Sequence, residues 1–266
     1  MWQASGRTMT VGVVSLTVQA LLFHLGSYGV TAFIAFLYLP FLVLPGRWMH
    51  HGTRLWVRIT FWLLRVTAGL DWQVRGRDHL PAGPAIFASK HQSAWETLVF
   101  YLLFDDPAYV LKRELFWIPF YGWYAKKARS VAVDRGGGAR AMRSMIQGAE
   151  AAIADGRNII IFPEGTRAAP GSGRPFHPGA AALYARLGVP LVPVALNSGL
   201  FWPRRRFLKR PGRITLEFLP AIEPGLDRKE LRARLEGVIQ DATRRLEGEA
   251  QSAPEPRRDG RASGEA

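Results

Sequence analysis

The sequence contains a long uncharged segment near its N-terminus. Residues 8–46, 39 in all, include no Asp, Glu, Lys or Arg and are interrupted by His24, Gly26, Pro40 and Pro45. As one continuous helix this segment would be roughly 58 Å long, nearly twice the ~30 Å hydrocarbon core of a bilayer. We therefore expect two pieces, of which residues 26–44 are the better candidate for a membrane span.

Basic residues flank this segment unequally. Arg7 precedes it, whereas Arg47, Arg54, Arg58 and Arg65 follow it. Because arginines near a membrane segment favour the cytoplasmic side, we expect an inner (cytoplasmic) membrane location with the following domain in the cytoplasm. A signal peptide would also begin at Arg7, but no small-residue cleavage site follows the apolar run, which favours a retained anchor.

Residues 55–65 are rich in Trp, Phe and Leu, with two arginines seven positions apart. This pattern is typical of a helix that lies in the membrane interface. An amphipathic helix packed on a protein core has the same pattern. The sequence leaves both interpretations open.

The remainder predicts an α/β fold with a mixed, largely parallel sheet flanked by helices. The domain prediction is residues 1–70 for membrane-anchoring helices, 71–248 for the α/β domain and 249–266 for a disordered tail. Apolar runs predict strands, and longer periodic segments predict helices. The predicted strands are 84–89, 109–112, 130–133, 158–162, 191–196 and 213–218, and the predicted helices are 94–104, 138–155, 178–187 and 227–246.

Residues 90–96, Lys-His-Gln-Ser-Ala-Trp-Glu, follow the first of these strands. Ser93 and Glu96 have the spacing of a capping box at the start of the next helix, which leaves His91 unexplained. Residues five apart on a helix lie roughly 140° apart, so His91 can meet Glu96 only if it precedes the helix. A histidine oriented by a carboxylate keeps one ring nitrogen free as a general base.

Residues 162–167, Phe-Pro-Glu-Gly-Thr-Arg, follow another buried strand. Ligands of α/β sheets bind at the carboxyl ends of strands, which is where Glu164, Thr166 and Arg167 fall. Arginine can hold a phosphate through two parallel hydrogen bonds. A Pro-Gly turn with a solvated arginine would give the same residues.

The chain is strongly basic, with 35 Lys and Arg against 21 Asp and Glu, a net charge of +14. Such a surplus suits an anionic partner: nucleic acid, anionic lipid headgroups, CoA or an acidic carrier protein. Residues 201–213 combine Phe201 and Trp202 with six cations. Next to an apolar N-terminus this cluster favours a membrane surface, with the two aromatic residues at the interface, over RNA or the adenine of CoA. A solvated basic loop would give the same residues.

Residues 90–96 and 162–167, taken together, resemble the glycerolipid acyltransferase family, which includes 1-acyl-sn-glycerol-3-phosphate acyltransferases. Further blocks agree with the resemblance in order and spacing over roughly residues 80 to 200. They are residues 112–123 (Lys-Arg-Glu-Leu-Phe-Trp-Ile-Pro-Phe-Tyr-Gly-Trp), 131–135 (Val-Ala-Val-Asp-Arg) and 189–194 (Val-Pro-Leu-Val-Pro-Val).

The resemblance implies that His91 deprotonates a glycerol hydroxyl, which attacks the thioester of acyl-CoA or acyl carrier protein. Glu96 stands where the family has aspartate, so it keeps the charge but adds a methylene. The implied acceptor and phosphate site consists of Lys112, Arg135, Glu164, Gly165, Thr166 and Arg167. The resemblance further implies that residues 192–194 pack this site. No metal or other cofactor is implied, and the partners are a lysophospholipid, the acyl donor and membrane lipids, without nucleic acid.

The sequence does not favour a mechanism in which a serine or cysteine of the protein forms an acyl-enzyme. Ser93 lacks the Gly-x-Ser-x-Gly surround of a nucleophile elbow, and the chain contains no cysteine. Direct transfer needs no protein nucleophile, and the resemblance implies that the acceptor is the sn-2 hydroxyl of 1-acylglycerol 3-phosphate and the product phosphatidic acid. Two alternatives stay open: acylation of another lysolipid, such as lyso-ornithine lipid, and a non-catalytic basic adaptor for membranes or RNA.

Overall fold

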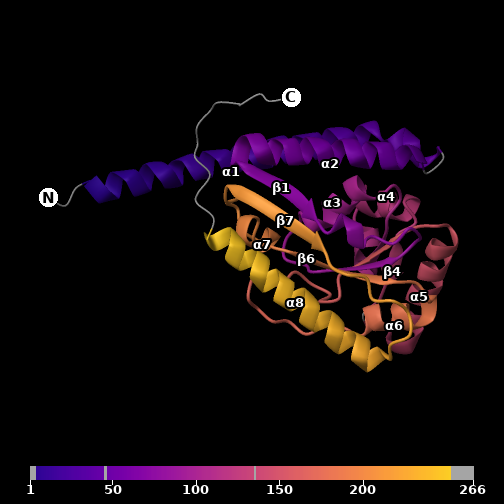
Figure 1. Cartoon of the computed structure of the whole chain (residues 1–266). Coiled ribbons are helices and arrows are strands. Elements are labelled where there is room, and N and C mark those ends of the chain that lie inside the picture. The colour runs from indigo at the N-terminus through magenta and orange to yellow at the C-terminus, as the bar shows by residue number, and fades with distance from the viewer. Residues whose placement is uncertain (1–3, 45–46, 135, 253–266) are drawn as a thin grey trace.

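The structure, a computed structural model, describes residues 4–44, 47–134 and 136–252. Its main body is a twisted sheet between two layers of helices, with α1 (Ala4–Leu37) and α2 (Arg47–Ala68) side by side above one layer (Figure 1). Predicted positions in residues 253–266, and Arg135, lie outside the described residues. The remaining short elements are η1 (Leu39–Leu42), η2 (Arg77–His79), η3 (Arg113–Trp117), α4 (Tyr121–Lys127) and α7 (Ser198–Phe201).

The two strands that precede residues 90–96 and 162–167 are neighbours at the centre of the sheet, so their carboxyl ends lie where a ligand site is expected. Its order is β1-β7-β6-β2-β5-β3-β4, and all pairs are parallel except β6 with β7. This confirms the predicted mixed, largely parallel α/β fold. The strands are β1 (Leu70–Arg75), β2 (Ile86–Ser89), β3 (Ala108–Lys112), β4 (Val131–Val133), β5 (Ile159–Ile161), β6 (Leu191–Leu196) and β7 (Gly212–Phe218).

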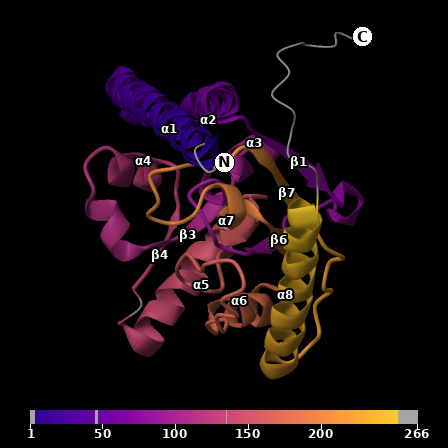
Figure 2. The ribbon, with the colours of Figure 1, turned by 90° about the vertical axis from the view of Figure 1, so that its left-hand side faces the viewer.

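Helices cover both faces of the sheet, so the central strands are apolar throughout. On one face α5 (Gly138–Ala154), α6 (Gly179–Leu187) and α8 (Arg228–Ser252) pack through small and aliphatic side chains such as Ala149 and Leu235. On the other face α2 and α3 (Glu96–Leu103) pack through larger rings such as Phe61 and Trp95, which stack with centroids 5.5 Å apart. Figure 2 shows the two helical layers on opposite sides of the strands.

Residues 8–37 of the uncharged segment lie in one helix. α1 continues through Gly26 and ends at Leu37, shortly before Pro40, so the predicted break at residue 26 is wrong. A glycine inside a helix costs only about 1 kcal/mol, which the packing of α1 on α2 outweighs, and Gly26 lies opposite the Leu63 side chain of α2. Gly52 of α2 makes a separate close contact, since a Cβ there would lie 1.9 Å from the ring of Tyr38, just after the end of α1.

α2 packs on the domain along one side, and a location of its other side in the membrane interface stays a prediction. Val57 and Leu64 are buried against the sheet layer, as in an ordinary amphipathic helix. On the outer side Leu55, Trp62 and Val66 are 47–60% exposed. Within the described residues, Leu16–Leu37 of α1 is the one helical stretch long and apolar enough to cross a membrane, judged by length and composition alone.

Two elements differ from the prediction at the edges of the domain. β1, which pairs with β7 from Leu70 to Arg75, is missing from the predicted strands although Leu-Asp-Trp-Gln-Val-Arg alternates apolar and polar residues. α8 extends to Ser252, so the predicted tail begins too early. Leu246, the last residue of the predicted helix, is fully buried, and Glu249 beyond it pairs with Arg75 of β1 at 2.7 Å.

Candidate active site

The histidine peptide lies at the carboxyl end of β2, between that strand and α3. β2 is fully buried and pairs with both β5 and β6, so its end opens at the middle of the sheet. The Ser93 backbone N–H donates to Glu96 Oε1 at 2.6 Å, while Ser93 Oγ accepts from the Trp95 N–H at 2.9 Å. Only one half of the predicted capping box is present, because α3 begins at Glu96 with Trp95 as its N-cap and without a side-chain cap hydrogen bond, so Ser93 as N-cap is wrong.

The same carboxylate also holds the histidine. His91 Nδ1 lies 2.9 Å from Glu96 Oε1, and the Glu96 side chain is completely buried. His91 precedes the helix, as the five-residue spacing requires, and its ring stacks on Phe162 with centroids 4.3 Å apart. With Nδ1–H directed to the carboxylate, Nε2 is the ring nitrogen left to accept a proton.

Glu96 is the centre of a dense hydrogen-bond network. Besides His91, its two oxygens accept from the Gln92 and Ser93 backbone N–H groups and from the hydroxyls of Ser93 and Ser198. Burial alone would raise the pKa of Glu96, but the hydrogen bond and charge of His91, together with Ser93 and Ser198, outweigh it and lower the pKa. The carboxylate is therefore ionised and fixed in orientation.

Four residues of this network were missed by the sequence analysis: Gln92, Ser198, Gly199 and Glu247. Ser198 Oγ donates to Glu96 Oε2 at 2.8 Å, and the Gly199 N–H donates to Gln92 Oε1 at 3.0 Å. Gln92 Nε2 in turn donates to Glu247 of α8 at 2.7 Å. A usable signal existed for Ser198, because it is a polar residue just beyond the buried strand β6, which neighbours β2.

Replacing Ser198 with alanine should lower kcat/KM about tenfold, because a hydrogen bond to a charged group is worth about 1.5–3 kcal/mol. Loss of the donor raises the pKa of Glu96 toward its usual value, so the acidic limb of the rate profile should move to higher pH. pH–rate profiles of both proteins measure this shift. Ser130→Ala, which removes a buried hydroxyl with no partner among the described residues, is the matched control. Equal profiles for the wild type and Ser198→Ala would contradict the role.

A second buried charge pair lies beside the dyad. Lys90 Nζ contacts Glu164 Oε1, and the two side chains are 5% and 0% exposed. Burial raises the pKa of Glu164, and the Lys90 ammonium opposes this rise. The pair joins the end of β2 to the loop after β5, which carries Arg167. Glu164 therefore packs behind the site as a support for that loop.

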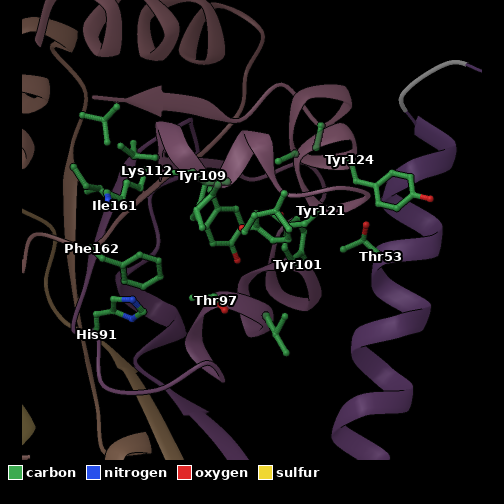
Figure 3. A pocket seen from close by; sticks show the side chains of 18 of the residues that line it. Thr53, His91, Thr97, Tyr101, Tyr109, Lys112, Tyr121, Tyr124, Ile161 and Phe162 are labelled. Carbon is green, nitrogen blue, oxygen red and sulfur yellow. The ribbon is translucent and has the colours of Figure 1, made fainter. Parts of the chain in front are cut away.

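A cavity of about 1070 Å³ opens onto His91. One part is bounded by Lys112, Gly165, Arg167 and His177, and the other reaches residues of α1 and α2 such as Thr31 and Trp56. Figure 3 shows His91 and Lys112 at one side of the cavity and Tyr101, Tyr121 and Tyr124 toward α1 and α2. The cavity thus joins a proton acceptor and two cations to an apolar path leading to the outer helices.

The predicted site residues are only partly brought together. His91, Lys112, Gly165 and Arg167 line the cavity, whereas Glu96 stands behind His91 and Glu164 and Thr166 do not line the wall. Lys112 is half exposed and pairs with Glu114 at 3.0 Å. Arg135 lies outside the described residues, so its part in the site stays a prediction.

Tyr109 is a polar residue of the cavity that the sequence did not indicate. Its side chain is 2% exposed, it lines the cavity, and its hydroxyl has no partner among the described residues. Burial raises the pKa of this hydroxyl well above its usual value, so it is a neutral donor at physiological pH. The part of the chain that the structure describes holds no group of three or more His, Asp or Glu side chains placed to bind a metal.

Comparisons with known proteins agree with this geometry. A family model described as Acyltransferase matches residues 71–197. The chain is 36% identical to a 1-acyl-sn-glycerol-3-phosphate acyltransferase of Pseudomonas aeruginosa over 77% of this chain and 82% of that protein. It is 29% identical to the mouse alpha enzyme of the same name, over 71% and 67% of the two chains.

A solved structure also resembles the fold. It is the crystal structure of the 1-acyl-sn-glycerophosphate acyltransferase PlsC from Thermotoga maritima, with a TM-score of 0.71. The match covers 91% of this chain and all of that chain at 22% identity. At this identity the likeness establishes the shared fold alone.

Proposed function

The chain belongs to the acyltransferase family, and from that premise we propose that it is a 1-acyl-sn-glycerol-3-phosphate O-acyltransferase. The enzyme transfers a fatty acyl group from a CoA or carrier-protein thioester to the sn-2 hydroxyl, and the product is phosphatidic acid. The observation that carries the proposal is the His91–Glu96 pair at a cavity that joins Arg167 to the apolar outer helices.

The chemistry follows from the orientation of His91. Nε2 accepts the proton of the acceptor hydroxyl as its oxygen attacks the thioester carbonyl carbon. Glu96, ionised and bonded to Nδ1–H, stabilises the imidazolium that forms. When the tetrahedral intermediate collapses, the C–S bond breaks and the leaving thiolate takes the proton from Nε2. An ester and a free thiol result, and His91 returns to its neutral form.

Arg167 is the cavity residue best suited to the acceptor phosphate. It is half-buried, lines the cavity with His91, and makes no ion pair with a carboxylate of the described residues. Its guanidinium can bind two phosphate oxygens at once. Lys112 on the same wall supplies a second cation, and the family resemblance adds Arg135 as a third.

The apolar end of the cavity supports access from a membrane. α1 contacts the domain near the middle of its apolar stretch Leu16–Leu37 and at the end of that stretch: His24 Nε2 lies 3.2 Å from the Phe207 carbonyl oxygen, and Phe36 packs against Phe120. We propose that α1 lies along the membrane surface and buries its outer side chains there, with the domain on the cytoplasmic side. These exposed side chains are Val18, Leu21, Leu22, Leu25, Tyr28, Phe33, Phe36 and Leu37.

An acyl-transfer assay with purified protein in detergent tests the function. The donors are a long-chain acyl-CoA and an acyl carrier protein, and the acceptors are 1-acylglycerol 3-phosphate and a lysolipid without phosphate. Turnover with the phosphorylated acceptor is expected. Turnover restricted to the phosphate-free acceptor would replace the proposal by another lysolipid acylation, and no turnover with either would favour a non-catalytic adaptor.

Arg167→Gln should lower kcat/KM for 1-acylglycerol 3-phosphate about 10- to 100-fold, because it removes charge-assisted hydrogen bonds to phosphate. The phosphate-free lysolipid should be acylated no more slowly than by the wild type. Arg174→Gln, an exposed arginine farther along the same loop, is the matched control. An equal loss with both acceptors would show that Arg167 supports the fold of the site and does not bind phosphate.

A further inference from the structure

The loop between α7 and β7 carries exposed cations that the proposed chemistry leaves unused. We name residues 203–210 the basic loop. Four of its five cations are exposed: Arg204, Arg205, Arg206 and Arg210. None of the four makes an ion pair with a carboxylate of the described residues. An arginine group of this kind, held together and unneutralised, is suited to an anionic ligand.

The fifth cation fastens the loop to α1. Lys209 is 3% exposed, and its ammonium lies over the rings of Phe23 and Trp202 at 5.8 and 5.4 Å. It also donates to the Arg206 and Phe207 carbonyl oxygens at 3.1 Å. Burial lowers the pKa of Lys209 to about 8. This residue therefore fixes the position of the loop and is not one of its ligand-facing cations.

Two apolar residues of the loop extend the exposed surface of α1. Phe207 and Leu208 are 46% and 37% exposed, and the Phe207 ring stacks on His24 with centroids 4.9 Å apart. Leu21 and Leu25, close to His24 on α1, are exposed as well. The sequence instead predicts Phe201 and Trp202 at the interface, but both pack into the core cluster of the α2 layer.

The basic loop also adjoins the proposed acceptor site. Arg204 Nη1 donates to the Arg167 carbonyl oxygen at 3.1 Å, which ties the loop to the segment that carries the proposed phosphate-binding arginine. The loop lies beside α1 in both ribbon views (Figures 1 and 2). The surface along α1 thus includes the exposed arginines of the basic loop, the apolar pair Phe207 and Leu208, and the cavity.

We propose that the basic loop binds the phosphate headgroups of anionic lipids in the membrane surface along α1. Phe207 and Leu208 enter the interface, and Arg205, Arg206 and Arg210 hold the headgroups next to the cavity. The apolar pair is continuous with the exposed face of α1. Binding to a lipid surface requires this continuity, whereas binding to an acidic protein does not. The inference rests on the proposed membrane association, and its consequence is a local excess of anionic lipid where the acceptor enters.

Vesicle co-sedimentation of the full chain tests the proposal. The probes are vesicles of phosphatidylcholine alone and vesicles that also contain phosphatidylglycerol, each at low and high salt. The test variant combines Arg205→Gln, Arg206→Gln and Arg210→Gln, and it leaves Arg204 in place because of its bond to the Arg167 segment. The matched control combines Arg228→Gln, Lys229→Gln and Arg232→Gln at the exposed start of α8, on the opposite side of the sheet from α1 (Figure 1).

At low salt, the wild type and the control should bind the vesicles that contain phosphatidylglycerol more tightly than those of phosphatidylcholine alone. High salt should abolish this difference. The test variant should lose about fivefold in partitioning for each arginine removed and keep its binding to phosphatidylcholine. Equal binding of the wild type to both vesicles would overturn the proposal. So would a variant that binds vesicles normally but loses transfer from acyl carrier protein and not from acyl-CoA, because the loop would then dock the acidic carrier.

Failure of this inference is separate from failure of the proposed function. The sedimentation assay needs no turnover, and transfer in detergent micelles needs no vesicle. The triple variant should acylate 1-acylglycerol 3-phosphate in micelles at the wild-type rate while losing its preference for anionic vesicles. A wild type that turns over in micelles but shows no such preference would overturn the headgroup site and leave the acyltransferase assignment intact.

Discussion

Replacing His91 with alanine should reduce kcat for acyl transfer about 10²–10⁴-fold while the protein stays folded. The variant loses the nitrogen that accepts the hydroxyl proton, and no other histidine among the described residues has a carboxylate at Nδ1 within this cavity. Acceptor affinity should change little, because Arg167 and Lys112 remain. Initial rates with saturating 1-acylglycerol 3-phosphate measure the loss, and circular dichroism with thermal unfolding reports the fold.

His177→Ala is the control for this loss. His177 lines the same cavity, and no carboxylate of the described residues contacts its ring. Its removal should lower kcat much less than removal of His91. Similar losses in the two variants would mean that the assay reports the shape of the cavity, and His91 would no longer stand as the base.

Replacing Lys90 with methionine should lower the free energy of unfolding by about 3–5 kcal/mol, since it leaves the Glu164 carboxylate buried without its partner. Methionine keeps a similar length, so the effect reports charge more than volume. Chemical denaturation in detergent measures it. Arg186→Gln, which breaks the exposed pair of Arg186 with Glu150, is the control and should cost no more than about 1 kcal/mol.

A double-mutant cycle separates the pair from the packing around it. Glu164→Gln alone should also be destabilising, because Lys90 is then the unpaired buried charge. Lys90→Met combined with Glu164→Gln removes both charges and should recover most of the loss, as replacing both members of a buried pair often does. Additive losses in the double variant would show that the two side chains stabilise the protein independently.

Much of the fold could be predicted because its signals are local. Residues 159–162 form an unbroken apolar run, and the central strand Ile159–Ile161 is fully buried. β1 shows the limit of this approach: its alternation is clear, but Asp71 and Arg75 leave the strand less apolar than its neighbours. The course of α1 through Gly26 could not be predicted, since the space beside that glycine depends on Leu63 of another helix.

In the candidate site, sequence spacing predicted a contact where both residues lie in the same short segment. His91 and Glu96 lie five positions apart and meet at 2.9 Å. Ser198 is 102 positions from Glu96 and Glu247 is 155 from Gln92. No periodicity or spacing relates residues so far apart, because the sheet order that unites them is a property of the whole fold.

The sequence by itself determined the alternation of strands and helices, the dyad at a strand end, the arginine loop and the apolar N-terminal segment. Each depends on residues within a few positions of one another, where backbone geometry fixes which side chains can meet. Only the tertiary structure decided that Glu164 is paired with Lys90, that Ser198 orients Glu96, and that α1 lies along the domain with the basic loop attached. These arrangements arise from buried charge and packing between distant segments, whose energies exist only after the chain has folded.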